Sequence, residues 1–201
     1  MNTSKIFLLI GFLILNLSGT SQKKTLYFDI LRNGNKVGMI VFSQSVSGGI
    51  DSLRSESTVK TKLIRSVVAE AKETAVFKDG ILKESFIYRK LNGQEKANKK
   101  HRAVNGKYVI TIGTQLSELD AYPITYNMLC LYSKEPVNIR KVYSDNHESS
   151  LKIEKIEDHK YKVILPDDNY NYYLYKDGVL NQVEIHRSLY SAKVVLVTKR
   201  T

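Results

Sequence analysis

The chain has 201 residues, of which 42% are hydrophobic and 25% are charged, and these ordinary proportions exclude a disordered or fibrous protein. Its only cysteine, Cys130, excludes an internal disulfide framework. The formal net charge of +11 at pH 7 directs attention to anionic partners.

The first 21 residues have the three parts of a secretory signal peptide. Lys5 gives a positive start, Ile6–Leu17 is uncharged and apolar, and Gly19 and Ser21 suit the −3 and −1 positions of a cleavage site. An uncleaved membrane anchor is the alternative, but twelve helical residues reach only about 18 Å against a hydrocarbon core of roughly 30 Å. We therefore expect export, with cleavage near Ser21, to the periplasm or the exterior. No later stretch of the sequence is apolar over the length of a transmembrane helix.

The basic charge has two interpretations in an exported protein. Anionic lipid headgroups, lipopolysaccharide and acidic polysaccharide are the available partners there, and we predict no nucleic-acid partner. The densest basic run, Lys96–Arg102, falls within one expected hairpin arm and is too short to form a groove. The sequence therefore favours a lysine-rich solvated surface over a basic binding site.

Five Asx-Gly dipeptides punctuate the chain after its signal peptide. A type I′ turn needs positive φ at both central residues, which Asn or Asp followed by Gly tolerates best, and it matches the twist of paired strands. The dipeptides therefore predict an antiparallel fold rich in hairpins. They are Asn33-Gly34, Asp79-Gly80, Asn92-Gly93, Asn105-Gly106 and Asp177-Gly178.

Segments of β-prone residues flank these turns, and many alternate polar with apolar positions. The expected strands cover residues 25–31, 36–42, 52–63, 67–78, 81–90, 95–104, 107–113, 137–143, 151–157, 161–165, 170–176, 179–189 and 192–199. Thr114–Pro136 lacks alternation, and within it Pro123–Ser133 has the spacing of a short helix. The sequence thus predicts one mainly β domain over residues 22–201. Its sheet is antiparallel and strongly curved, a half-barrel or barrel-like structure of about ten to twelve strands around one short helix.

One short segment occurs twice. Phe77–Leu82 (FKDGIL) returns as Tyr175–Leu180 (YKDGVL), and an ancient duplication or two hairpins with the same turn chemistry would both produce this match. The similarity continues weakly and pairs Ile87 with Ile185, Arg89 with Arg187 and Leu91 with Leu189.

Several of these segments, in this order, resemble a known family. Phe28–Gly38 has the form F-x-I-x-x-N-G-x-x-V-G, and Glu73–Leu82 has the form E-T-x-x-aromatic-x-D-G-x-L. The proline-led segment Tyr122–Leu131 and a final hairpin at Asp177-Gly178 follow. In these features the chain resembles domain-of-unknown-function family 6134 of exported Gram-negative proteins. It is more distantly similar to families likened to the lipoprotein carrier LolA. The resemblance implies a curved antiparallel half-barrel around helical segments and supplies no catalytic residues.

The residues that could carry chemistry do not form a recognisable motif. The histidines, His101, His147, His159 and His186, show neither i, i+2 nor i, i+4 spacing, and those beside acidic residues fall in expected polar turns. Cys130 could be a nucleophile or an intermolecular bridge, but its apolar neighbours predict a small buried side chain. We therefore predict no catalytic residue, no metal site and no cofactor.

A strand with many tyrosines suggests a place for a ligand. Tyr170–Lys176 is apolar on both faces, so both faces should be covered, either by ordinary packing or by a cavity between sheet and helix. An apolar ligand in such a cavity would contact adaptable methionine, leucine and tyrosine side chains. The candidates are Met39, Tyr126, Met128, Leu131, Tyr172 and Leu174.

Three functions fit these expectations. The first is an exported binding protein that holds a hydrophobic or lipid-like ligand, which a free cavity above roughly 300 Å³ would favour. The second is a structural or interaction module that binds an envelope protein, which a solid core with an exposed apolar patch would favour. The third is a hydrolase, which would require at least two of the histidines to converge on a carboxylate.

Overall fold

The structure is a computed structural model that describes residues 22–62 and 66–197. The expected signal peptide, with its cleavage site at Ser21, lies outside the described residues. So do the last residue of the expected strand 52–63 and the last two of the expected strand 192–199. Within the two described ranges, no helix is long and apolar enough to cross a membrane.

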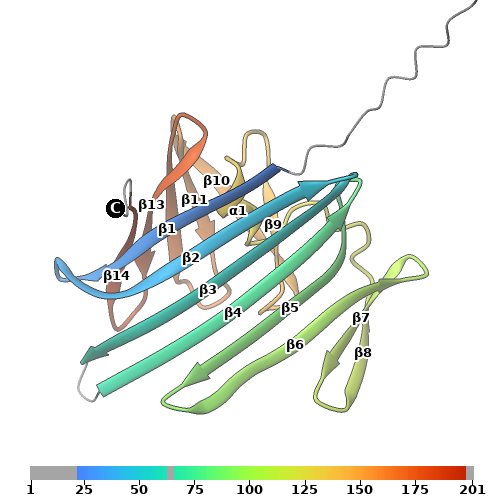
Figure 1. Cartoon of the computed structure of the whole chain (residues 1–201), viewed down its shortest axis with the longest axis horizontal. Helices are drawn as coiled ribbons and strands as arrows, with labels where there is room; N and C mark the ends of the chain where they lie inside the picture. The colour runs from blue at the N-terminus through green and yellow to red at the C-terminus, as the bar shows by residue number, and fades with distance from the viewer. Residues whose placement is uncertain (1–21, 63–65, 198–201) are drawn as a thin grey trace, which may run out of the picture.

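One antiparallel sheet of fourteen strands forms the framework (Figure 1). The strands follow the order β8-β7-β6-β5-β4-β3-β2-β1-β14-β13-β12-β11-β10-β9, so β8 and β9 are its two edges. The bounds are β1 Gln22–Arg32, β2 Asn35–Ser47, β3 Ile50–Lys62, β4 Ser66–Lys78, β5 Ile81–Leu91, β6 Gln94–Val104, β7 Lys107–Ile112, β8 Gln115–Leu119, β9 Lys141–Ser144, β10 Ser149–Glu157, β11 Lys160–Ile164, β12 Tyr170–Lys176, β13 Val179–His186 and β14 Ser191–Leu196.

The sheet is strongly curved. Figure 1 shows β1–β6 crossing in front of β9–β14, with the helix α1 (Cys130–Ser133) between the two layers. The predicted fold class, a mainly β and curved antiparallel sheet around one short helix, is confirmed. The strand count exceeds ten to twelve partly because β8 lies in the segment that showed no alternation. Four of the five β8 residues are exposed, so no buried face marks this strand in the sequence.

The five Asx-Gly dipeptides form the predicted turns. Their Asn and Asp residues have φ between 48° and 51°, and their glycines have φ between 73° and 79°. These are the two successive positive φ values that a type I′ turn requires. Each dipeptide joins two neighbouring antiparallel strands, so the hairpin pattern of the sheet follows directly from local turn chemistry.

The helix is much shorter than the predicted Pro123–Ser133. Before Cys130 the chain pairs with β9: the Tyr143 N–H donates to the Tyr126 carbonyl at 2.9 Å, and the Met128 N–H donates to the Tyr143 carbonyl at 3.0 Å. The Ile124 N–H donates instead to the Tyr108 hydroxyl at 3.1 Å. Because neighbouring elements occupy these backbone groups, a longer helical ladder does not form. The expected strand at 137–143 likewise begins only at residue 141.

The segment around α1 fills one end of the curved sheet. The Tyr132 ring packs against Phe28 and Phe42 from β1 and β2, with ring centroids 5.5 and 5.8 Å apart. Leu131 is completely buried beside them in the core cluster. Cys130 is also buried, as predicted, and burial raises the pKa of its thiol to about 12, which leaves the thiol protonated and unreactive.

The sheet consists of two meanders with the same strand order. The strands of the first meander lie in the order β6-β5-β4-β3-β2-β1, and those of the second lie in the order β14-β13-β12-β11-β10-β9. The two meanders meet where β1 pairs with β14, which we call the seam. The repeated segment forms the β4–β5 and β12–β13 hairpins, which hold equivalent places. Both have a register shift two residues before the Asx-Gly turn, at Phe77 and at Tyr175, but the β1–β2 and β5–β6 hairpins have the same shift, so it belongs to the turn. The shared strand order, with the two hairpins at equivalent positions in it, favours a duplication over two independent hairpins.

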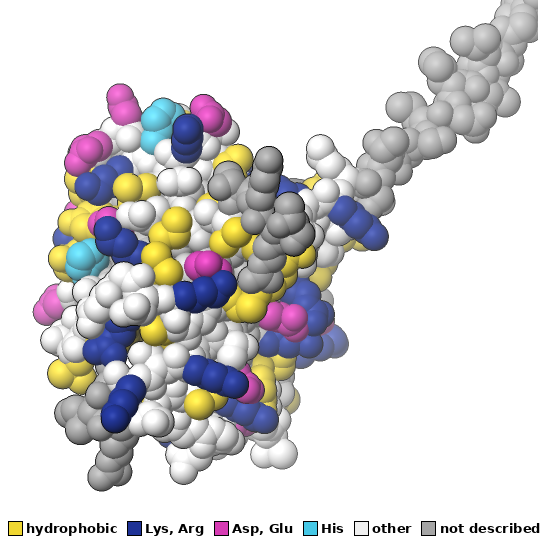
Figure 2. Space-filling view, turned by 60° about the vertical axis from the view of Figure 1, so that its left-hand side comes forward, with side chains coloured by type: hydrophobic (Ala, Val, Ile, Leu, Met, Phe, Trp, Pro, Cys, Tyr) yellow, Lys and Arg dark blue, Asp and Glu magenta, His cyan; other side chains and the backbone are white. Residues whose placement is uncertain are grey.

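Two acidic neighbours offset part of the charge of the basic run on β6. Lys99 pairs with Glu148 at 2.5 Å, and Lys100 and Arg102 pair with Glu84 at 3.2 and 3.3 Å. On the face in Figure 2, lysine and arginine side chains are dispersed among acidic and hydrophobic ones. This distribution agrees with the solvated basic surface that the sequence favoured.

Candidate functional site

Small side chains on the concave face of the sheet leave a large space. Ser57 lies opposite Ala71, and Val59 lies opposite Ala69, where β3 and β4 pair. Against these residues lies a cavity of about 580 Å³, which we call the apolar chamber. Its wall is mostly aliphatic and comes from both meanders; it includes Ile30, Val59, Val67, Ala69, Ile185 and Val194.

A smaller cavity of about 210 Å³, the polar pocket, adjoins the chamber. The two spaces share the wall residues Ile40, Ser57, Ala71, Glu73, Arg89 and Tyr132. The remaining wall of the polar pocket includes Asp145, His147, Asn171 and Arg187. The concave face therefore holds one composite site with an apolar end and a polar end.

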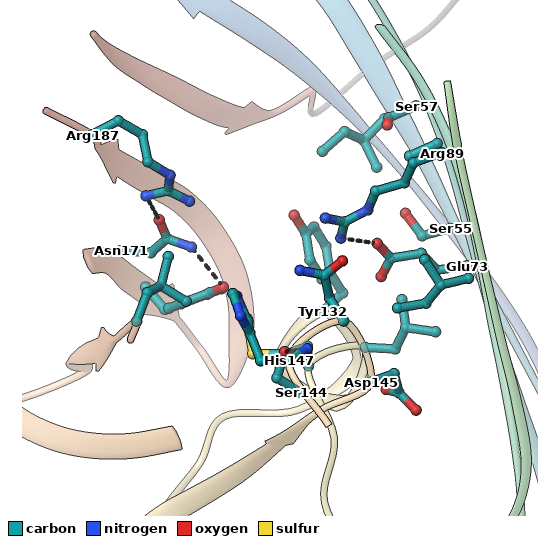
Figure 3. A pocket seen from close by; sticks show the side chains of 18 residues that line it. Ser55, Ser57, Glu73, Arg89, Tyr132, Ser144, Asp145, His147, Asn171 and Arg187 are labelled. Carbon is teal, nitrogen blue, oxygen red and sulfur yellow. Dashed lines mark hydrogen bonds and ion pairs between the residues drawn. The ribbon is translucent and has the colours of Figure 1, made fainter. Parts of the chain in front are cut away.

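Two arginines face the polar pocket from opposite walls (Figure 3). On β5, Arg89 Nη2 forms an ion pair of 2.6 Å with Glu73 Oε1. Just after β13, Arg187 Nη1 donates to Asn171 Oδ1 at 2.9 Å. Each partner precedes its arginine by 16 residues. The two pairs are thus equivalent in the internal repeat, with Asn171 in the place of Glu73.

The contacts of Arg187 are with neutral acceptors. Besides Asn171, its Nη1 donates to the carbonyl oxygens of Tyr170 at 3.3 Å and His186 at 2.8 Å. Among residues 22–62 and 66–197, no ion pair joins Arg187 to a carboxylate. The guanidinium is therefore held in place while its positive charge has no direct counter-ion.

A buried polar cluster lies behind the wall of the pocket. Asp145 accepts hydrogen bonds from the Ser85 hydroxyl and from Asn127 Nδ2, the latter at 3.0 Å. Its Oδ1 lies 3.8 Å from Nδ1 of His101, which is completely buried. Burial raises the pKa of Asp145 to about 6 and lowers the pKa of His101 to about 4.

This cluster does not have the geometry of a nucleophilic site. The Ser85 hydroxyl donates to Asp145 and not to an imidazole, so no base is placed to activate it. Neither ring nitrogen of His101 has a hydrogen-bond partner within the described chain. The described residues also contain no group of three or more His, Cys, Asp or Glu that could hold a metal ion. The arrangement gives the hydrolase hypothesis no support.

The buried His101 should make stability depend on pH. A lowered pKa favours the neutral ring in the folded state, so its contribution is complete above pH 6.5 and is lost as the pH falls through about 4. We expect the difference in unfolding free energy between wild type and His101→Phe to fall by about 2–3 kcal/mol from pH 7 to pH 4.5. Urea unfolding at the two pH values measures it.

Asp145 has the opposite effect, because its raised pKa contributes stability at low pH that is lost as the pH rises from 3.8 through about 6. Asp145 is present in both proteins, but its Oδ1 lies 3.8 Å from His101 Nδ1, so the two titrations are coupled and the comparison measures the pair. The control is His159→Phe, which replaces an exposed histidine. The difference in unfolding free energy between wild type and this variant should change by less than about 1 kcal/mol from pH 7 to pH 4.5. A pH-independent effect of His101→Phe would contradict the expectation.

The predicted lining residues lie in three places: the polar pocket, the core and the convex face of the sheet. Met128 lines the polar pocket. Tyr126 and Leu131 are buried in the core, and the Tyr126 hydroxyl donates to the Lys134 carbonyl at 2.9 Å.

The other three predicted lining residues lie on the convex face. Met39 alternates with Ile40, which faces the site. Tyr172 and Leu174 alternate with Asn171 and Tyr173, which line the pocket. The Tyr172 ring packs instead under Lys160 Nζ, 5.1 Å from its centroid. We therefore move Met39, Tyr172 and Leu174 out of the expected lining.

Sequence reasoning missed three charged residues of the site and the amide that contacts one of them. Glu73, Arg89, Asn171 and Arg187 were not among the candidates, although the internal repeat aligned Arg89 with Arg187. That alignment was the available signal, since equivalent positions of two meanders in one curved sheet can face a common interior.

Comparisons with known proteins agree on the fold. The model of a family described as Domain of unknown function (DUF6134) matches residues 28–197. A solved structure, a beta-barrel-like protein of domain of unknown function DUF1849 from Brucella abortus, is similar with a TM-score of 0.54 and 13% sequence identity. The alignment covers 86% of this chain and 94% of that one. At such identity the likeness shows the fold alone. The curated proteins contain no match.

Proposed function

Starting from the fact that this chain belongs to the DUF6134 family, whose function is unknown, we propose that it is an exported binding protein for a hydrophobic or lipid-like ligand. The observation that carries the proposal is the apolar chamber of about 580 Å³ on the concave face. Sites for small molecules are concave and mostly apolar, with volumes from about 300 Å³ upward. The chamber meets each of these conditions.

The composition of the chamber wall favours an apolar occupant over water. A buried water needs two to four polar partners, and most of this wall offers methyl and methylene groups. An alkyl chain or a ring system would instead bury its surface against Ile30, Val59 and Val194. The signal-peptide pattern of residues 1–21 supports a periplasmic location, where lipids and their precursors are available.

An interaction module of the envelope has less support. The most exposed large apolar side chains are Leu116 on β8, Val137 in the turn before β9 and Leu189 in the turn after β13. They come from three separate segments, and single exposed apolar residues are ordinary on protein surfaces.

Filling the chamber tests the proposal. We expect the purified protein to bind N-phenyl-1-naphthylamine, an uncharged apolar fluorophore, and Ala69→Phe to weaken this binding at least about tenfold. Ala69 faces the chamber, and the added ring would occupy the space left opposite Val59. Fluorescence titration gives both dissociation constants.

The matched control is Glu70→Phe, which adds the same side chain one residue further along β4, at an exposed position. It should leave the dissociation constant within about twofold. A wild-type protein that does not bind the fluorophore, or equal binding by both variants, would count against the proposal. Native mass spectrometry before and after organic extraction would then identify any ligand carried from the cell.

A further inference from the structure

We propose that the ligand is an amphipathic acid, whose oxyanion headgroup is bound at Arg187 in the polar pocket while its apolar chain fills the chamber. The headgroup is a carboxylate or a phosphate, which share the planar or tetrahedral oxygens that a guanidinium binds through two parallel hydrogen bonds. This inference rests on the proposed function and names the chemical class of the ligand.

The position of the polar pocket is the first argument. Because it shares six wall residues with the chamber, one molecule can contact both spaces. A chain lying against Val59 and Ala69 would reach the polar end past Ala71 and Tyr132, which line both spaces. An amphipathic molecule matches this order of surfaces, whereas a wholly apolar one would leave the polar end without a partner.

The charges at the polar end are the second argument. Glu73 already neutralises Arg89, with which it forms an ion pair. The Asp145 carboxylate points away from the two arginines in Figure 3, and its two oxygens accept hydrogen bonds from Ser85 and Asn127. Within the described chain Arg187 forms no ion pair, and the Asp167 carboxylate interacts with it only at longer range. The pocket therefore favours an anion over a cation beside this guanidinium.

The hydrogen bonds of Arg187 are the third argument. All three donate from Nη1, to Asn171 and to two carbonyl oxygens, within the part of the chain that the structure describes. They fix the orientation of the guanidinium and leave Nη2 and Nε as donors. These two nitrogens form one edge of the guanidinium, which is the edge that binds an oxyanion through two bonds.

The internal repeat explains why the Arg187 guanidinium is paired with an amide and not with a carboxylate. In the first meander the equivalent arginine is paired with Glu73, and in the second meander Asn171 stands at the corresponding position. An amide in place of a carboxylate still holds its arginine but does not neutralise it. The difference between two otherwise equivalent pairs gives the pocket one structural arginine and one binding arginine.

Competition with the fluorophore tests the headgroup. We expect dodecanoic acid or dodecyl phosphate to displace N-phenyl-1-naphthylamine from the purified protein with an inhibition constant at least about tenfold lower than that of 1-dodecanol. The more strongly bound of the two acids identifies the headgroup. Arg187→Gln should raise the constant of that acid about tenfold or more and leave those of dodecanol and the fluorophore within about twofold.

Arg32→Gln is the matched control, since Arg32 also lines the chamber but not the polar pocket, and it donates to the Lys62 carbonyl at 2.9 Å. It should leave the preference for the acid unchanged. Equal binding of acid and alcohol by the wild type would overturn this inference alone, and so would loss of the preference in Arg32→Gln but not in Arg187→Gln. If the fluorophore itself does not bind, the proposed function fails and the inference fails with it. Unchanged fluorophore binding shows that a variant is folded.

Discussion

Replacing Leu131 with alanine is expected to lower the free energy of unfolding by about 3 kcal/mol, within the range of 2–5 kcal/mol for buried leucines. Leu131 is completely buried, and its short helix is anchored by the Tyr175 hydroxyl, which donates to the Leu131 carbonyl at 2.7 Å. The surrounding strands cannot close over the lost methyl groups, so a cavity should remain. Urea unfolding of wild type and variant at pH 7 measures the difference.

The control is Leu116→Ala on β8, where the same side chain is 71% exposed and its removal should change the free energy by less than about 0.5 kcal/mol. Leu131 was also a predicted ligand contact, so the measurement separates two roles. If Leu131→Ala hardly affects stability but abolishes binding of the fluorophore, the residue contacts the ligand and our assignment to the core is wrong.

Gly38→Ala should also be strongly destabilising, by about 3 kcal/mol. A Cβ at this position in β2 would lie 2.2 Å from the Thr58 carbonyl oxygen and 2.9 Å from the Val59 Cα, both in the backbone of β3. Backbone atoms of a paired strand cannot move aside as a flexible side chain could, so the β2–β3 pairing must distort. Thermal or urea unfolding of the variant tests this expectation.

Gly48→Ala is the matched control, because its added Cβ would meet nothing within 4 Å. Its φ of +55° should cost about 1 kcal/mol, as a left-handed residue usually does. Equal losses for the two variants would show that backbone contact at Gly38 is unimportant. The close approach explains why the segment Phe28–Gly38, on which the family resemblance rested, ends in glycine.

Most of the sheet could be predicted because its information is local. Each Asx-Gly pair favours a turn because its two residues tolerate positive φ values, and this turn joins the strand before it to the strand after it. The helix was overestimated because Ile124 and Met128 lie at helical spacing. The Ile124 N–H, however, donates to the Tyr108 hydroxyl, and the Met128 N–H donates to the Tyr143 carbonyl. Those partners are distant in sequence, and spacing alone cannot reveal them.

The site was harder to predict than the fold. Tyr172 and Tyr173 have the same side chain on opposite faces of β12, so a period of two could not decide which one faces the interior. On β3 the inner residues Ser55 and Ser57 are small and uncharged beside the charged outer residue Glu56, but nothing local marks them as the wall of a cavity. Their importance comes from being small beside Ala71, which is a property of the assembled sheet.

The seam between β1 and β14 has a consequence for how the binding site is acquired during folding. Within each meander every strand pairs with its neighbour in sequence, whereas the seam pairs Phe28 with Leu196. Local pairings close small loops and form early, and a pairing between distant residues comes late. Because Ile30 and Val194, one from each strand of the seam, both line the chamber, the cavity is complete only after this last pairing. A ligand that binds the completed cavity would therefore slow the opening of the seam and stabilise both meanders together.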